Sequence, residues 1–454
     1  MKKFVLLVAL LGVLSADDID DALEGFDDIP QEQEALEDDL EGFGDEEINT
    51  QELLASQPQQ EKSFLDDFNG YVAFLSNYSY RSNSTLHDKI NIAKTSVFLD
   101  YENRFYKNWK FKINAKAYYD VIYNTQDGYT QQEKDAFESE LRLYDAYVEG
   151  SITQSLDAKL GRQVVVWGRS DTIRITDVLN PLDNRRFAMV DIEDLRLPTT
   201  MAKFDYYAGK WKISPIVILE QQFSLRPPFG SPFYPAPVDI EDKSYSDVTY
   251  ALSIGAEFKS WDVNFYGAYI RDDAGYVALP LTPTSQLEHP KVVMGGMALN
   301  YIYSSWLIKS ELAHFEKLRY TTVPNKEFSR SDALVGFEYN GIAETMISYD
   351  VALRYIDDYD TRLTQELIPK KQKTYEHALR VTSDFVNDTL HFNFLTFLQG
   401  ENLSDGGFIR IWGDYDYDDN LRLRVGVVDY IGGYGYFQQI KNEDMIFGEL
   451  RYSF

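Results

Sequence analysis

The stretch that decides the fold is WKFKINAKAYYDVIYN, residues 109–124. Its odd positions, from Trp109 to Tyr123, are all apolar or aromatic, and most of its even positions, from Lys110 to Asn124, are charged or amide. Side chains of a β-strand point to opposite faces with period two, so the pattern predicts a strand with one apolar and one polar face. It exceeds the ~9–11 residues that a tilted strand needs to cross a bilayer. We therefore predict one strand of a transmembrane barrel.

The same two-faced pattern recurs along most of the chain, and the connections between its segments alternate between short and long. The predicted strands are 68–80, 89–106, 109–124, 138–150, 156–168, 199–207, 211–221, 248–259, 261–271, 291–303, 306–318, 332–340, 344–355, 374–385, 389–399, 407–417, 420–431 and 444–454. Outer-membrane barrels have an even strand number, short periplasmic turns and longer external loops. The predicted fold class is all-β, a transmembrane antiparallel β-barrel of about 18 strands, with 16 as the alternative.

The composition agrees with a barrel and excludes several other classes of protein. Aromatic residues make up 15% of the 454 residues, with 33 Tyr and 28 Phe, and transmembrane barrels carry aromatic girdles at both interfaces. Beyond the N-terminus there is no run of ~18 apolar residues that would form a membrane-spanning helix. The absence of cysteine excludes disulfides and thiol catalysis, and the net charge of −29 argues against nucleic-acid binding.

The N-terminus is typical of a secreted protein. Lys2 and Lys3 precede the apolar run 4–14, and small residues end at Ala16, which predicts a signal peptide over residues 1–16; a buried N-terminal helix is the alternative. Residues 17–62 form an acidic periplasmic leader, in which residues 17–61 carry 18 Asp or Glu and no Lys or Arg, and the barrel follows over residues 63–454. The leader repeats Leu-Glu-Gly-Phe, ending at Phe26 and Phe43, so it is either a disordered tether or a pair of partner-docking motifs.

The last residues of the chain contain a further informative pattern. Apolar or small residues alternate up to Tyr452 and the terminal Phe454. This resembles the C-terminal signature of bacterial outer-membrane proteins, which the barrel-assembly machinery reads. The resemblance implies that Tyr452 and Phe454 are an assembly signal, that outer-membrane lipid and this machinery are partners, and that the location is the bacterial outer membrane with the N-terminal segment in the periplasm.

One central stretch is more specific than a generic barrel. It contains Gly161-Arg-Gln, Trp167-Gly, Asn180-Pro-Leu-Asp and Glu193-Asp-Leu-Arg-Leu-Pro. These motifs resemble an uncharacterised family of Gram-negative outer-membrane barrels, known chiefly as a domain of unknown function. The resemblance implies an outer-membrane channel or an export-associated barrel, in some lineages alongside inner-membrane exporters of hydrophobic molecules.

The loop 169–198 within this stretch balances arginine against carboxylate. Arginine forms paired bonds to carboxylates, so we expect this loop to fold inward, bind the wall and narrow the lumen; a surface loop and a partner-docking site are the alternatives. The predicted pore-lining and constriction residues are Arg162, Gln163, Trp167, Arg169, Asp171, Arg174, Asp177, Asp183, Arg185, Arg186, Asp191, Glu193, Asp194 and Arg196. The predicted lumen-wall residues are Lys110, Lys112, Lys116, Asp120, Arg422 and Arg424.

We find no motif of an enzyme or of a metal site. There is no Gly-x-Ser-x-Gly, and the Asp414, Asp416 and Asp418 run lacks the glycine and glutamate of a calcium loop, so we predict no catalytic residue, metal or cofactor. The predicted function is a porin-like outer-membrane channel for small or amphiphilic molecules, narrowed by loop 169–198. The alternative is a non-conducting outer-membrane component of a trans-envelope export complex, whose leader recruits a periplasmic or inner-membrane exporter partner.

Overall fold

The computed structural model describes residues 68–82, 89–106 and 108–454, apart from the side chains of Ile192 and Glu193. The predicted signal peptide and the acidic leader, with Phe26 and Phe43, lie outside the described residues. Within the described part, no helix is both long and apolar enough to cross a membrane.

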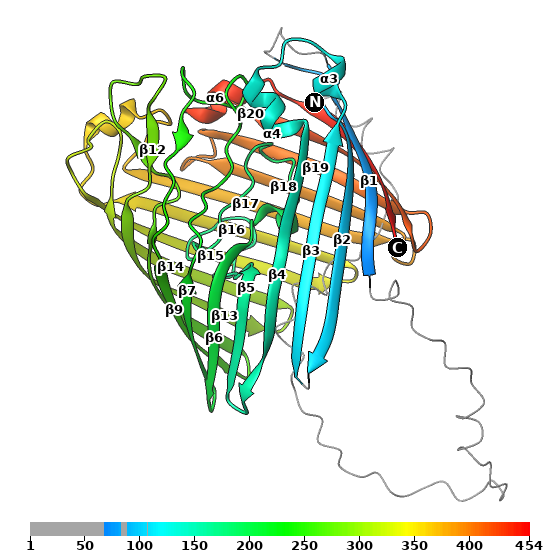
Figure 1. Ribbon diagram of the computed structural model, residues 1–454, viewed down its shortest axis with the longest axis vertical. Helices are drawn as coiled ribbons and strands as arrows, with labels where there is room; N and C mark the ends of the chain where they lie inside the picture. The colour runs from blue at the N-terminus through cyan, green and yellow to red at the C-terminus, as the bar shows by residue number, and fades with distance from the viewer. Residues whose placement is uncertain (1–67, 83–88, 107) are drawn as a thin grey trace, which may run out of the picture.

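Eighteen antiparallel strands form one closed barrel, as the sequence predicts (Figure 1). Each strand pairs with the next along the chain, and the barrel closes between the first and the last strand. At the closure, Gly70 and Phe454 exchange two backbone hydrogen bonds of 2.9 Å. The strands are β1 (Phe68–Ser79), β2 (Ala93–Tyr106), β3 (Trp109–Asp120), β4 (Ser139–Thr153), β5 (Leu156–Gln163), β6 (Thr199–Ala208), β7 (Trp211–Ile218), β9 (Thr249–Phe258), β10 (Trp261–Arg271), β13 (Lys291–Tyr303), β14 (Trp306–Leu318), β15 (Phe328–Ile342), β16 (Thr345–Ile356), β17 (Lys373–Phe385), β18 (Leu390–Gln399), β19 (Gly406–Asp416), β20 (Leu421–Ile431) and β21 (Met445–Ser453).

The long connections carry the remaining elements at one end of the barrel, and the short turns lie at the other end (Figure 1). The extra elements are α3 (Ile122–Thr125), α4 (Gln131–Phe137), η2 (Thr361–Gln365), α6 (Tyr436–Ile440) and a small sheet of β8 (Glu241–Asp242), β11 (Tyr276–Val277) and β12 (Gln286–Glu288). The helix α5 (Ile192–Leu195) belongs to the connection between β5 and β6.

The two faces of β3 separate as the sequence pattern predicts, but the strand is shorter than predicted. Ile113 and Tyr119 are exposed on the outer face, whereas Asn114 is buried on the inner face. The predicted strand 109–124 ends at Asp120, because the Asp120 carboxylate accepts hydrogen bonds from the backbone N–H groups of Ala93 and Ile122 and turns the chain into α3. Tyr123, which the alternation places on the outer apolar face of the predicted strand, is instead buried at the mouth of the barrel.

The predicted strand 156–168 also ends early, at Gln163, because the chain there leaves the wall and enters the lumen. We call residues 164–198 the inserted segment. Its apolar side chains, including Trp167, Ile173 and Ile175, share one buried cluster with inward-facing residues of the wall, among them Met294 and Leu334. The lumen of this barrel is therefore partly filled by a hydrophobic core, rather than lined only by polar groups.

The outer face yields a prediction of stability. Ala115 is cross-strand neighbour to Leu99, an exposed outer-face residue, and lies near the middle of β3. An Ala115→Arg change places a charge toward lipid near mid-membrane, and we expect it to lower the free energy of unfolding by about 2–4 kcal/mol. Urea unfolding of protein refolded into vesicles measures this loss. Ala115→Leu is the matched control, and an equal loss in both variants would contradict this orientation of β3.

Candidate functional site

The inserted segment is closed at its base by a single asparagine. The Asn180 side chain accepts from Val165 N at 2.8 Å and donates to the carbonyl oxygens of Gln163 and Leu197 at 3.2 and 3.0 Å. These bonds join the residues at which the chain leaves β5 and enters β6. Gln163 is itself fully buried and donates to Met201 O at 3.1 Å. The asparagine of the Asn180-Pro-Leu-Asp turn thus holds the two ends of the segment together.

A buried carboxylate on β14 binds the tip of the segment. Glu311 is 1% exposed, and its two oxygens accept four hydrogen bonds. Oε1 accepts from the backbone N–H groups of Arg169 and Ser170 at 2.6 and 3.0 Å, and Oε2 accepts from the backbone N–H and hydroxyl of Thr176 at 3.1 and 2.7 Å. Backbone N–H groups and hydroxyls lose their hydrogen bonds to water when they are buried. The Glu311 carboxylate replaces those bonds for the donors at the tip, which would otherwise destabilise the segment.

The Trp167-Gly168 pair fits closely beside this carboxylate. Trp167 stacks on Tyr266 of β10, with ring centroids 4.6 Å apart. Gly168 has a φ of +89°, and a Cβ at this position would lie 2.8 Å from a Glu311 oxygen. The backbone conformation and the space both require glycine. On the same wall, the Ser170 hydroxyl donates to Asp350 of β16 at 2.6 Å.

The segment also binds the opposite wall, through Asp191. Its carboxylate pairs with Arg410 of β19 at 2.6 Å and with Arg424 of β20. Burial raises the pKa of the Asp191 carboxyl, but the two guanidinium groups outweigh it and hold that pKa well below the usual range. Next to it, Phe187 packs against Phe408, and its carbonyl accepts from the Tyr430 hydroxyl at 2.5 Å. The inserted segment therefore crosses the lumen and is bound on both sides.

A third set of contacts joins the segment to β3 and β4. Asp194 pairs with Lys116 at 2.6 Å, and Arg185 pairs with Glu140 of β4 at 2.8 Å. Arg185 also pairs with Asp183 at 2.6 Å, and Arg186 lies 3.4 Å from Asp120. Most of the charges predicted to form a constriction thus pair with each other or with the wall.

The roles of several predicted residues differ from the prediction. Gln163 and Trp167 were predicted to line the constriction, but they are 0% and 4% exposed, so they hold the segment rather than border open space. Asp177 is also buried, and it pairs with both Arg174 and Arg196. The side chain of Glu193 lies outside the described residues.

The other predicted residues keep polar partners on the inner wall. Their partners are Glu220 for Arg162, Asp262 for Arg169, Lys309 for Asp171, Glu102 and Glu149 for Lys110, Asp100 for Lys112, and Asp416 for Arg422. Tyr452 and Phe454 are about half exposed on the outer face.

Sequence reasoning did not find the wall residues that bind the segment, namely Glu311, Asp350, Asp262 and Arg410. Each is a charged residue on the inner face of a predicted strand. The alternation of apolar and polar residues along that strand therefore predicts that its side chain points into the lumen. Nothing local marks which of the charged residues on the inner face contacts the segment, because the partners are about 90 to 220 residues apart in the chain.

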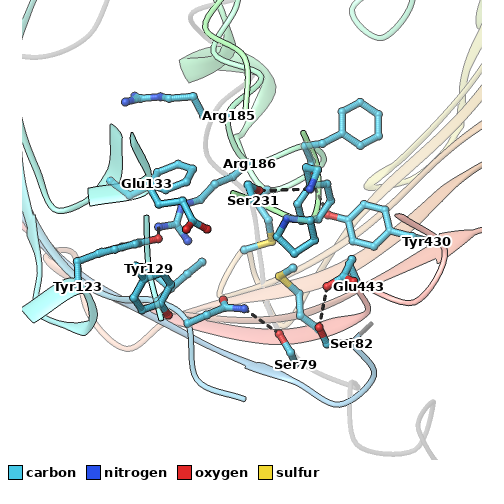
Figure 2. Close-up of a pocket in the computed structure, with 18 residues that line it drawn as sticks. Ser79, Ser82, Tyr123, Tyr129, Glu133, Arg185, Arg186, Ser231, Tyr430 and Glu443 are labelled. Carbon is cyan, nitrogen blue, oxygen red and sulfur yellow. Dashed lines mark hydrogen bonds between the residues drawn. The ribbon is translucent and has the colours of Figure 1, made fainter. Parts of the chain in front are cut away.

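The inserted segment leaves narrow cavities on both of its sides. The outer cavity lies at the long-loop end, between α4, the 185–189 stretch and the ends of β20 and β21, and Figure 2 shows Tyr123, Tyr129 and Glu133 on one side of it and Tyr430 and Glu443 on the other. The inner cavity lies between the segment and β1–β4, and it shares Phe137, Arg185, Arg186 and Met189 with the outer cavity. The far cavity lies between the segment and the wall from β6 to β16.

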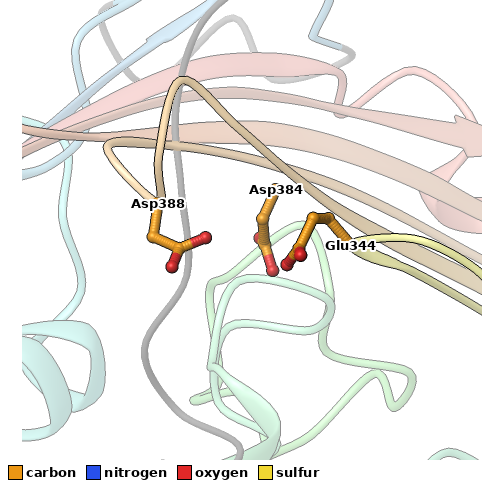
Figure 3. A group of neighbouring side chains, drawn as sticks. All are labelled: Glu344, Asp384 and Asp388. Atoms are coloured by element: carbon orange, nitrogen blue, oxygen red, sulfur yellow. The ribbon is translucent and has the colours of Figure 1, made fainter.

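Three carboxylates also gather at the short-turn end of the barrel. Glu344, Asp384 and Asp388 approach one another closely enough to share a cation (Figure 3). Glu344 and Asp388 are exposed, and Asp384 also pairs with His391 at 3.0 Å. Exposed acidic groups on turns are common without a ligand, and this cluster adds nothing to the site in the lumen.

Comparison with known proteins identifies a family and a fold. Residues 75–454 match the family described as "Protein of unknown function (DUF1302)". No curated protein matches the sequence. The structure is similar to a BenF-like porin from Pseudomonas fluorescens Pf-5, with a TM-score of 0.53, 11% identity and coverage of 86% of this chain and 99% of that one.

Two further solved structures have similar statistics. Acinetobacter baumannii OccAB3 is 10% identical to this chain, with a TM-score of 0.50, and the match covers 86% of this chain and 99% of the OccAB3 chain. Pseudomonas aeruginosa OpdK, solved with vanillate, is 10% identical, with a TM-score of 0.50, and covers 86% of this chain and 100% of its own. At these identities the similarity establishes the barrel fold alone.

Proposed function

We propose that this chain, which belongs to the DUF1302 family of proteins of unknown function, is a porin-like channel of the bacterial outer membrane for small or amphiphilic molecules. The observation that carries the proposal is the inserted segment, which crosses a closed 18-stranded barrel and leaves cavities on both sides. A barrel of this size without an obstruction would enclose an aqueous channel. The segment then sets the size and charge of what passes.

The fold supports this class of function over catalysis. Of the structures with a similar fold named above, one is a BenF-like porin and another, OpdK, is an outer membrane protein. Most of the polar groups described above in the lumen pair with one another or with the backbone. We propose no enzymatic step and no cofactor. We further propose that Tyr452 and Phe454 are read during assembly and that the N-terminal segment lies in the periplasm.

Planar-bilayer conductance tests the channel. The comparison is between the refolded full-length mature chain and a variant in which residues 169–196 are replaced by a short Gly-Ser linker. We expect small conductance steps for the unaltered protein and steps several-fold larger for the variant, because removal of the segment frees the lumen. Silence in both proteins, with folding confirmed by circular dichroism, would overturn the channel.

A second candidate function is a non-conducting component of a trans-envelope complex. The observation that favours it is the hydrophobic core between the segment and the wall, which fills part of the lumen. In that case the unaltered protein is silent and only the variant conducts. The acidic leader would then recruit the partner, and Phe26→Ala with Phe43→Ala would abolish capture of that partner by the leader.

A further inference from the structure

The inner cavity contains cations and carboxylates in similar number, but they are not equally paired. Its cations are Lys94, Lys116, Arg142, Arg185, Arg186 and Arg451. Its carboxylates are Glu140, Asp183, Asp191, Asp194 and Glu449. The electrostatic character of the cavity depends on which of these charges are already neutralised by a close partner.

Every carboxylate of the inner cavity has a cationic partner, and the two partners of Asp191 lie outside the cavity. Asp191 is bound by Arg410 and Arg424, neither of which lines the cavity. Asp194 is paired with Lys116. The three others pair inside the cavity: Asp183 and Glu140 with Arg185, Glu140 also with Arg142, and Glu449 with Arg451.

Two cations of the inner cavity have the weakest carboxylate contacts in it. Lys94 of β2 forms no ion pair among the described residues, and its ammonium lies 5.1 Å from the centre of the Tyr118 ring. Arg186 contacts Asp120 only at 3.4 Å, and the other oxygen of Asp120 already accepts from two backbone N–H groups. Because both cations line the same cavity, that cavity favours an anion.

The outer cavity supplies aromatic side chains next to these charges, and Glu133 and Glu443 also line it. Tyr123 lies 4.5 Å from Tyr129 and 5.9 Å from Phe137 between ring centroids, and Phe187 and Phe233 line the same space. Arg186 lies over the Phe137 ring at 4.4 Å, at the boundary that the two cavities share. Figure 2 shows the Arg186 side chain reaching toward Tyr123 and Glu133. An apolar region thus adjoins a cationic one.

The far cavity has the opposite character. All four of its cations are ion-paired: Arg174 with Asp177, Arg271 with Asp247, Arg330 with Asp332, and Arg354 with Asp332 and Glu376. Asp272 and Asp273 line it and form no ion pair among the described residues. An anion would therefore be favoured on one side of the inserted segment only.

We propose that the joined outer and inner cavities bind an amphiphilic organic anion. Its charged group lies between Lys94 and Arg186, and its apolar part lies against the aromatic side chains of the outer cavity. This inference names the solute class of the proposed channel and in that sense rests on it. A site of this kind would collect such solutes at the mouth and direct them along the β1–β4 side of the lumen.

The test is binding of 2-naphthoate to the refolded protein in a non-ionic detergent, measured by isothermal titration calorimetry, with neutral 2-naphthamide as the matched ligand. We expect 2-naphthoate to bind at least about tenfold more tightly than the amide. We expect Lys94→Gln or Arg186→Gln to lower the affinity about tenfold, because each removes a charged donor from the carboxylate of the ligand. Lys94→Arg should restore binding. Lys212→Gln, an exposed site on β7, should leave it unchanged.

Equal binding of the two ligands, or no loss in either glutamine variant, overturns the anion site. Circular dichroism and resistance of the folded barrel to mild heating in detergent confirm that the variants fold. Calorimetry does not require conduction, so the two proposals fail separately. A conducting barrel that does not bind 2-naphthoate overturns only the solute class, and a silent barrel that binds it overturns only the channel.

Discussion

A Glu311→Ala variant is expected to show single-channel conductance several-fold above that of the unaltered protein. The substitution removes the acceptor of three backbone N–H groups and one hydroxyl at the tip of the inserted segment. Each buried donor left without a partner costs about 1–3 kcal/mol. We expect the released tip to leave its place against the wall and to bind water, which enlarges the passage there. Loss of the bonds to Glu311 should lower the free energy of unfolding by up to about 3 kcal/mol.

Planar-bilayer recordings and urea unfolding in detergent measure the two effects of Glu311→Ala. Glu316→Ala is the matched control, because Glu316 lies on the same strand and is exposed. Glu311→Gln keeps the shape of the side chain but has a single acceptor oxygen, so an intermediate conductance is expected. If Glu311→Ala conducts like the control, the segment is not held by this carboxylate.

Replacing Asp191 with alanine is expected to release the segment from the opposite wall. Arg410 is 3% exposed and Asp191 is its ion-pair partner, while Arg424 retains Asp414. Removal of one partner from a buried pair typically costs about 3–5 kcal/mol, because a buried charge is left uncompensated. We expect a loss of about that size in urea unfolding, with fluctuating conductance levels in bilayers. Asp419→Ala, on the exposed turn between β19 and β20, should change neither measurement.

The acid dependence of this contact has a definite sign. The guanidinium groups of Arg424 and Arg410 outweigh burial and lower the pKa of Asp191 below that of the unfolded chain. A lowered carboxyl pKa contributes stability that is present above the unfolded value, about 3.9, and is lost only as the pH falls toward the folded value. Conductance of the unaltered protein should therefore not rise between pH 7 and 4.5 through loss of this pair.

The strands were predictable because their signal is local. The predicted ranges 261–271, 291–303 and 306–318 coincide with β10, β13 and β14, and the other ranges differ mainly at their ends. The alternation of faces and the spacing of turns depend only on neighbouring residues. The errors fall where a distant group changes the path of the chain: Asp120 turns the end of β3 toward α3, and Asn180 draws the end of β5 to the start of β6.

The candidate site was predictable in its charges but not in its contacts. The balance of arginine and carboxylate in 169–198 led to the expectation of pairing with the wall, and Lys116 and Arg424 were both predicted on the inner wall. The sequence did not show that Glu311 binds the tip or that Arg410 binds Asp191. Nor did it show that Trp167 is buried against Tyr266, because a hydrophobic core inside a barrel lumen is not expected from the alternation of the strands.

The sequence by itself determined that the chain forms an antiparallel barrel of about 18 strands and which face of each strand is apolar, since both follow from periodicity and turn chemistry along the chain. It placed the start of the long loop at residue 169, whereas the chain leaves the wall after Gln163. Only the tertiary structure decided what the lumen contains. Closure of the barrel brings Glu311, Arg410 and Lys94 to the inner wall around one segment, and which charges pair there, and which stay uncompensated, depends on distances across the lumen. Ion pairs form only between groups that lie a few ångströms apart in space. The spacing of residues along the chain does not give that distance for residues on different strands.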